Sequence, residues 1–342
     1  MTQAIGIPDL LNRHSQPGRI DFKVEVPCPM KNRFQAAIDQ FEREHLEATG
    51  ERYRSFVPNV CGEHVDGAGT IRDIAAATDI DQIPDICIDF ASGPFSSPQI
   101  VERFVRTGAF EQVIAVSGVP WLADPAAFID PYGAYNILAV NPEVMLVETR
   151  ALNGRPAPRS LEDLLDPIWE SSICLPDNHK HIGTRFFSAI RQRFGEDGLA
   201  ALDRNAVTAM NGSTIARSAG HDTPKAAIYL LPWVFARGAA RPGKLDLVWP
   251  DDGANCNPIV LMVKRERAAK NNALLEFLLS PTVARVFADN QFPATRPGTD
   301  NGLPEGATVR WLGWDHVLSG VQAEWDAEFI VRYNRFHHDN SC

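Results

Sequence analysis

Three of the six cysteines stand where a thiol could bind a metal. Cys28, Cys61 and Cys256 each follow a strand-like run, in the polar turn that precedes the next element. In an open α/β sheet, ligands bind at the carboxyl ends of the strands, so thiols in such turns can face one shared cleft. Thiolate sulfur suits zinc, copper(I) and iron–sulfur clusters. The positions therefore predict a metal ion or an iron–sulfur cluster as the cofactor.

Histidine side chains extend this predicted metal site. His64 follows Cys61 by three residues, so one loop can present both side chains to one centre. His179, His181 and His221 lie in predicted loops of the second half of the chain, and closure of two lobes could bring them over the same site. Because the chain has no Cys-x-x-Cys pair, the predicted site is spread over several loops. Simple packing of the cysteines as small apolar side chains remains the structural alternative.

A second group of side chains could bind an organic or oxyanionic ligand instead. Ser92 and Gly93 follow a predicted strand, and Thr184 and Arg185 begin a helix, so hydroxyls, backbone N–H groups and a guanidinium could hold an anionic group. Trp121 could line the same cleft, since aromatic walls are common in ligand pockets. Helix capping and core packing are the structural alternatives for these residues.

Signatures of catalysis are nearly absent. The chain contains no GxxxxGK[ST] phosphate loop, no GxGxxG after a strand, no HExxH and no GxSxG elbow. A thiol-dependent enzyme that pairs Cys28 or Cys61 with His179 or His181 stays open, because such partners meet only in space. None of these motifs therefore supports an enzyme.

Composition and charge limit the partners. The 342 residues are 44% hydrophobic, carry a formal charge of −10 and show no clustered Lys and Arg, which disfavours nucleic acid and anionic membranes as partners. No run of about 18 apolar residues predicts a transmembrane helix. Residues 1–20 lack the basic start and the apolar core of a secretory signal. As written, the chain is predicted to be cytoplasmic with reduced cysteines, and periplasmic if it has been trimmed.

Strand-like and helical runs alternate along the chain. Residues 20–26 alternate like a strand before a helical run over 31–47, and residues 86–90 form a short buried strand. Such βα units place their turns along one edge of a parallel sheet. Two apolar runs, 135–140 and 143–147, are separated by Asn141-Pro142 and predict a broken strand that carries the chain from one lobe to another.

Several longer segments carry a family pattern: Pro84-Asp85-Ile86-Cys87, residues 158–177 (PRSLEDLLDPIWESSICLPD), residues 226–235 (AAIYLLPWVF) and residues 250–281. Together with the order of elements, they resemble the bacterial extracellular solute-binding proteins of the type 2 periplasmic binding protein superfamily, in the branch of iron, thiamine and polyamine binders. The resemblance implies that residues 253–263 form a returning hinge strand. It also implies ferric coordination by adjacent tyrosines, but the five tyrosines include no adjacent pair. Ferric binding of that kind is not predicted.

The predicted fold is α/β and two-lobed, like a type 2 periplasmic binding protein. Each lobe is a largely parallel sheet flanked by helices, and the ligand cleft lies between the lobes. Residues 1–19 form an N-terminal extension, residues 20–141 and 253–342 form lobe 1, and residues 142–252 form lobe 2.

The predicted function is that of a solute-binding protein that holds a metal ion or metal-containing cofactor in the cleft through Cys and His side chains. Its hinge angle changes on binding, and it acts as an intracellular carrier or sensor whose partner is a cofactor-accepting protein or a transporter. The alternatives are an ABC-transporter-type binding protein for a small organic or oxyanionic ligand, and a thiol-dependent enzyme.

Overall fold

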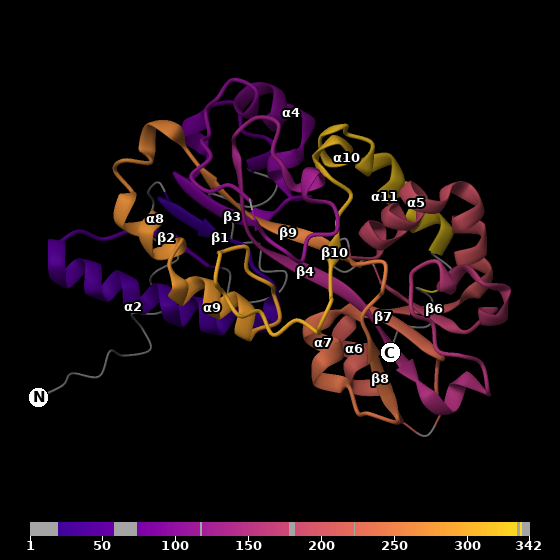
Figure 1. Cartoon of the computed structure of the whole chain (residues 1–342). Helices are drawn as coiled ribbons and strands as arrows, with labels where there is room; N and C mark the ends of the chain where they lie inside the picture. Colours follow the sequence, from indigo (N-terminus) through magenta and orange to yellow (C-terminus); the bar gives the residue numbers. More distant parts are fainter. Residues whose placement is uncertain are drawn as a thin grey trace, which may run out of the picture.

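The described strands form one mixed, ten-stranded sheet that runs the length of the molecule (Figure 1). The computed structural model describes residues 20–57, 74–116, 118–177, 182–221, 223–333 and 336. The strands are β1 (Phe22–Val24), β2 (Ser55–Phe56), β3 (Ile86–Phe90), β4 (Tyr135–Glu148), β5 (Ile173–Pro176), β6 (Ala206–Met210), β7 (Ile228–Pro232), β8 (Leu245–Val248), β9 (Ala254–Val263) and β10 (Val309–Arg310).

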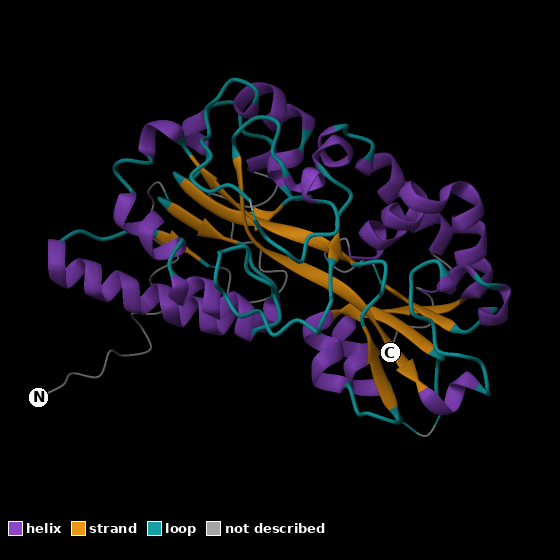
Figure 2. Cartoon of the chain, viewed as in Figure 1, coloured by secondary structure: helices purple, strands orange, loops and turns teal. Residues whose placement is uncertain are grey.

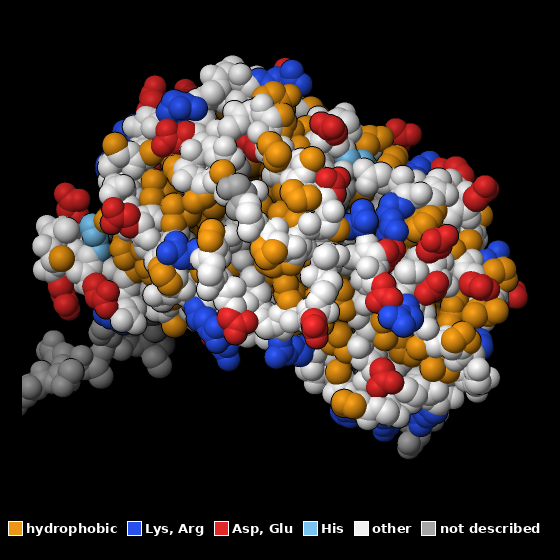
Figure 3. Space-filling view, in the orientation of Figure 1, with side chains coloured by type: hydrophobic (Ala, Val, Ile, Leu, Met, Phe, Trp, Pro, Cys, Tyr) orange, Lys and Arg blue, Asp and Glu red, His pale blue; other side chains and the backbone are white. Residues whose placement is uncertain are grey.

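Helices cover both faces of the sheet (Figure 2). They are α2 (Lys31–Thr49), α4 (Pro98–Ile100), α5 (Ile182–Asn205), α6 (Gly212–Ser218), α7 (Trp233–Ala239), α8 (Asn272–Leu278), α9 (Pro281–Asp289), α10 (Trp314–Leu318) and α11 (Gln322–Tyr333). None of these described helices combines the length and the apolar character that a membrane crossing requires. On the face in Figure 3, acidic and basic side chains are interspersed rather than separated by sign.

Parallel pairs lie at the two ends of the sheet and antiparallel pairs at its centre. The strand order is β2-β1-β3-β9-β4-β7-β5-β6, with β10 beside β9 and β8 beside β4. β1 pairs in parallel with β2 and β3, and β5 with β6 and β7. β4 and β9 are antiparallel to each other. β4 is also antiparallel to β7, and β9 is antiparallel to β3. We call the part around β1–β3 the first half and the part around β5–β8 the second half.

β4 is one continuous strand of 14 residues, so the predicted break at Asn141-Pro142 is wrong. The Val140 N–H donates to the Pro293 carbonyl, on the side away from β9. Since residues two apart in a strand face the same way, the Pro142 nitrogen also faces away from β9. The proline therefore removes no donor from the β4–β9 ladder, and the strand continues through it.

Pro258 in β9 is accommodated in the same way. Its carbonyl accepts from the Ala91 N–H, so its nitrogen faces the side of β3 rather than β4. The β3–β9 ladder ends at Phe90 and Ile259, and the β4–β7 ladder begins at Glu143. Among the described strands, only β4 and β9 pair with each other across the stretch between these two points.

Apolar cores lie on each side of this crossing. In the first half, α2 and α9 contribute Phe34 and Phe287, whose rings lie 5.6 Å apart. In the second half, Trp169 and Phe187 of α5 are buried in one core. α11 also packs on α5, and its Tyr333 belongs to the core of the second half, whereas the sequence placed residues 253–342 in lobe 1. The remaining lobe boundaries stay a prediction.

Asn136 is a fully buried amide that ties the start of β4 to neighbouring chain segments. Its Oδ1 accepts from the backbone N–H groups of Val113 (2.6 Å) and Ile114 (2.9 Å). Its Nδ2 donates to the carbonyls of Glu111 and Leu261, both at 3.0 Å. All four hydrogen-bonding positions of the amide are therefore used.

We expect Asn136→Ala to lower the free energy of unfolding by about 3 kcal/mol or more, because each buried group left without a partner costs about 1–3 kcal/mol. Urea denaturation measures the change. The matched control is Asn272→Ala, since Asn272 is exposed on α8 and bonds only to Glu276 among the described residues. The control should change stability by no more than about 0.5 kcal/mol. Equal effects of the two substitutions would contradict the assignment.

Candidate functional site

Four polar side chains lie on one face of the sheet where β4 and β9 cross between the halves. Asn141 stands opposite Asn257 in the ladder, so the two side chains share a face. Glu143 and Asn255 are each two residues further along and lie on the same face. Asn255 Nδ2 donates to Glu143 Oε2 at 2.8 Å. All four are at least 94% buried, and we call them the hinge-strand polar cluster.

Two atoms of this cluster have no hydrogen-bond partner among the described residues: Asn141 Oδ1 and Asn257 Nδ2. The other amide atom, Asn257 Oδ1, is 3.5 Å from the Ser92 hydroxyl, which follows β3. A buried polar atom without a partner costs about 1–3 kcal/mol. Such atoms are rare in native proteins and call for an explanation. An acceptor and a donor on directly opposed residues are suited to a ligand that offers the complementary groups.

Arg185 reaches the cluster from the second half. It lies in the first turns of α5, is almost fully buried, and its guanidinium is 6.0 Å from the centre of the Phe90 ring at the end of β3. Burial lowers the pKa of Arg185, while the nearby carboxyl groups of Glu143 and Asp326 raise it. The cluster thus lies where a helix of the second half meets a strand end of the first.

Glu143 has an unusual proton affinity. Burial raises its pKa to about 7, against the opposing effects of the Arg185 charge and the hydrogen bond from Asn255. A carboxyl group with such a pKa changes its charge near neutral pH. The cluster can therefore present either a neutral acid or a carboxylate to a ligand.

Two of the residues predicted to hold an organic or oxyanionic ligand, Ser92 and Arg185, lie at this cluster. Thr184 is fully buried beside Arg185. Gly93 shapes the turn after β3, since a Cβ there would lie 2.7 Å from Asp89 Oδ1. Trp121 packs instead against the core of the first half.

The predicted metal ligands are not brought together in the part of the chain that the structure describes. Cys28 is in a disulfide bond, and because Cys87, Cys174 and Cys256 are free, its partner lies outside the described residues. In this form Cys28 has no thiolate to offer a metal. His221 is exposed, with its Nε2 atom 2.8 Å from the Arg217 carbonyl.

Cys256 lies inside β9 rather than in the predicted turn. Its neighbours Asn255 and Asn257 face the cluster, so Cys256 faces the opposite side of the sheet. It is buried in the core of the first half, and burial raises the pKa of its thiol well above the usual value.

Four more predicted ligands fall outside the described residues: Cys61, His64, His179 and His181. Among the described residues, no three His, Cys, Asp or Glu side chains are grouped to hold a metal ion. The predicted iron–sulfur cluster thus gains no support from the described part of the chain.

Sequence reasoning missed the amides and the carboxyl of the cluster. Asn141 stands before a proline, a pattern that predicts a break in the strand, and Asn255 and Asn257 flank Cys256, which the sequence predicts to be a metal ligand in a turn. The available signal was the spacing: polar residues two apart, in two apolar strands, share one face. Their meeting across β4 and β9 depends on a pairing over more than 100 residues, which no local pattern indicates.

Comparison with known proteins identifies the family of the chain. The model of the family described as bacterial extracellular solute-binding protein matches residues 81–319, and the chain belongs to this family. Comparison with curated protein sequences finds no significant match. The resemblance stated from the sequence is therefore confirmed at the level of the family.

Solved structures of similar fold include the Bordetella ferric binding protein, with 16% identity, a TM-score of 0.59, and coverage of 94% of this chain and 99% of that one. A Trichodesmium protein in complex with iron and citrate has 15% identity, a TM-score of 0.60, and coverage of 92% and 99%. An ABC transporter structure from Clostridium perfringens has 16% identity, a TM-score of 0.60, and coverage of 93% and 99%. At these identities the likeness shows the fold alone, and it confirms the two-lobed α/β architecture.

The pKa of Glu143 predicts a pH dependence of stability. A carboxyl whose pKa is about 7 when folded and 4.5 when unfolded stabilises the fold fully below pH 4.5 and loses this contribution as the pH rises through 7. The loss is on the order of 3 kcal/mol. Glu143→Gln should therefore flatten the stability profile between pH 4.5 and 7, as measured by urea denaturation.

Glu276→Gln is the control, because Glu276 is an exposed carboxylate on α8. It should keep the slope of the unsubstituted protein. A Glu143→Gln profile that retains the full slope would contradict the raised pKa.

Proposed function

We propose that this protein is the solute-binding component of an ABC-type importer, and that its ligand is a small polar organic or oxyanionic solute held at the hinge-strand polar cluster. Membership of the extracellular solute-binding family supports the general role. The observation that carries the ligand class is the pair of buried amide atoms without partners, Asn141 Oδ1 and Asn257 Nδ2. A ligand donor would satisfy the first atom and a ligand acceptor the second.

The surroundings of the pair favour a ligand with a negatively charged or strongly accepting group. Arg185 supplies a guanidinium, which binds carboxylate and phosphate oxygens in a fixed geometry. The Ser92 hydroxyl, which lies 3.5 Å from Asn257 Oδ1, adds a polar group from the first half. The nearby Glu143 repels an anion when it is ionised and can donate a hydrogen bond when it is protonated.

Binding at this place would favour closure of the two halves. Phe90 and Ser92 belong to the first half and Arg185 to the second, while Asn141 and Asn257 lie on the strands between them. A ligand in contact with both halves gains more interactions when they approach each other, and this differential affinity shifts the hinge toward a closed state.

A metal ion in the same cleft is the second candidate, because the titles of similar structures name ferric binding proteins and an iron complex. Glu143 is the cluster's own carboxyl, and the predicted ligands Cys61, His64, His179 and His181 would have to complete the site.

We expect Asn141→Ala and Asn257→Ala to weaken ligand binding at least about tenfold, since each removes an amide that the ligand satisfies. The substitutions should leave the thermal stability of the ligand-free protein unchanged or higher, because each removes a buried atom without a partner. A panel of carboxylates, amino acids, phosphate and ferric ion, screened by thermal shift and titrated by calorimetry, provides the measurement.

Asn272→Ala serves as the control that changes an amide far from the cluster in the fold. Tight binding of ferric ion alone, with no response to any organic or oxyanionic compound, would favour the metal candidate. Ligand binding that both alanine variants retain in full would contradict the proposed site.

We also propose that the protein works outside the cytoplasm. The family description supports this placement. The disulfide at Cys28 supports it independently, because disulfides persist in oxidising compartments and are rare in the cytosol. This proposal replaces the cytoplasmic placement predicted from residues 1–20.

Alkylation followed by intact-mass spectrometry tests the disulfide. Of the six cysteines, four should be alkylated in denaturant without reductant, and all six after reduction. Cys28→Ser should yield five alkylated thiols without reductant, because the former partner becomes free. Six modified thiols in the unreduced protein purified from its native compartment would contradict the proposal.

A further inference from the structure

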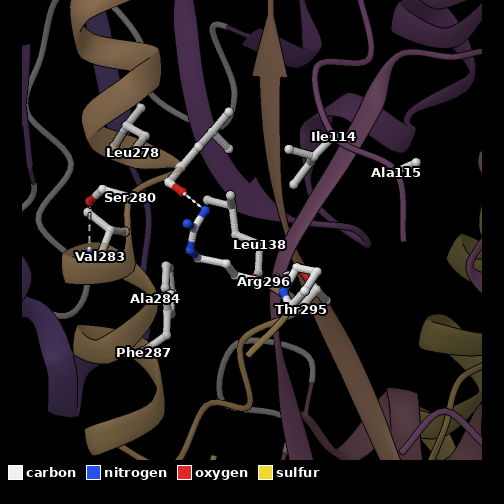
Figure 4. Close-up of a pocket in the computed structure, with 12 residues that line it drawn as sticks. Ile114, Ala115, Leu138, Leu278, Ser280, Val283, Ala284, Phe287, Thr295 and Arg296 are labelled. Atoms are coloured by element: carbon white, nitrogen blue, oxygen red, sulfur yellow. Dashed lines mark hydrogen bonds between the residues drawn. The ribbon is translucent and has the colours of Figure 1, made fainter. Parts of the chain in front are cut away.

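A cavity of about 280 Å³ opens on the first half, between α8, α9 and the start of β4 (Figure 4). Its walls are mainly apolar. Leu138 comes from β4, Leu278 from α8, and Val283 and Phe287 from α9, and all four side chains are more than 90% buried. Ala284 contributes only a methyl group, which leaves room in the wall.

The cavity has walls that are held in place by the rest of the fold. The backbone at Ile114 is fixed by the Asn136 amide, and Thr295 donates its hydroxyl hydrogen to the Ile137 carbonyl at 2.5 Å. The Ser280 hydroxyl caps α9 by accepting from the Val283 N–H at 3.3 Å. A ligand would therefore enter a space that exists before binding, with little ordering required.

Arg296 is the one charged side chain among the residues that line the cavity. Its Nη1 atom donates to the Leu279 carbonyl at 2.8 Å, which holds the guanidinium beside the apolar walls (Figure 4). The side chain is exposed, and it forms no ion pair with the described carboxylates. An apolar cavity with a cation beside it is complementary to a molecule with an apolar tail and an anionic head.

We propose that this cavity binds a medium-chain carboxylate, with its hydrocarbon tail against Leu138, Val283 and Phe287 and its carboxylate on Arg296. A water molecule has about 30 Å³ of liquid volume, and a methylene group is of similar size, so the cavity accommodates about nine such groups. It is too small for a helix of a partner protein, whose diameter with side chains is about 10–12 Å. The cavity shares no residue with the hinge-strand polar cluster, so the proposal is independent of the solute site.

Calorimetric titration of the full-length protein with octanoate and with 1-octanol tests this proposal. Octanoate should bind saturably, with a Kd below about 1 mM. Arg296→Gln should weaken octanoate binding about tenfold and leave 1-octanol binding within about twofold, because only the head group meets the guanidinium. Arg285→Gln, an exposed arginine on α9 that pairs with Asp289, is the matched control and should change neither affinity.

A second experiment tests the proposal by filling the cavity with a larger side chain. Ala284→Phe should abolish binding of both compounds while the protein keeps its cooperative thermal unfolding, and Ala284→Leu replaces it if the larger side chain prevents folding. Asn141→Ala should leave octanoate binding unchanged, which separates this cavity from the solute site. The proposal is overturned if octanoate does not bind, if a folded filling variant binds it normally, if Arg285→Gln has the same effect as Arg296→Gln, or if Asn141→Ala abolishes binding.

Discussion

Two strands, β4 and β9, pass between the halves of the molecule. Their antiparallel pairing joins the strands of the first half to those of the second. On one side of the crossing the ladder is extended by β3 and β1, and on the other by β7 and β5. The cores of the two halves pack on either side of the same strands, and α5 also contacts the first half, where Gln192 Nε2 donates to the Leu312 carbonyl at 3.0 Å. The polar cluster lies on these two strands, between the apolar cores of the two halves.

The burial of the polar cluster is unfavourable for the stability of the fold. Glu143 and Arg185 are both almost completely buried, and burial disfavours the charged form of each. Breaking such a pair leaves one buried charge without compensation, which is strongly destabilising. Under the proposed function, a ligand would supply the interactions that the fold leaves incomplete at Asn141 Oδ1 and Asn257 Nδ2.

The sequence predicted the class of fold well and the site only in part. Local periodicity located β3 at residues 86–90 and the long helix after residue 31, because these elements depend on patterns within a few residues. Asparagine and proline at positions 141 and 142 pointed to a break in the strand, since a local pattern does not show which way a proline nitrogen faces. Cys256 was placed in a turn because the flanking asparagines are typical of turns, whereas pairing with β4 keeps the segment in a strand.

The two prolines of the central strands have a mechanical consequence. A third strand could add to β4 or β9 only through donors on their outer edges, and Pro142 and Pro258 remove one donor from each of those edges. Among the described strands, residues 140–142 of β4 and 256–258 of β9 pair only with each other. A two-stranded ribbon tolerates a wider range of twist than a broad sheet does, and the amides of Asn141 and Asn257 lie within this short stretch.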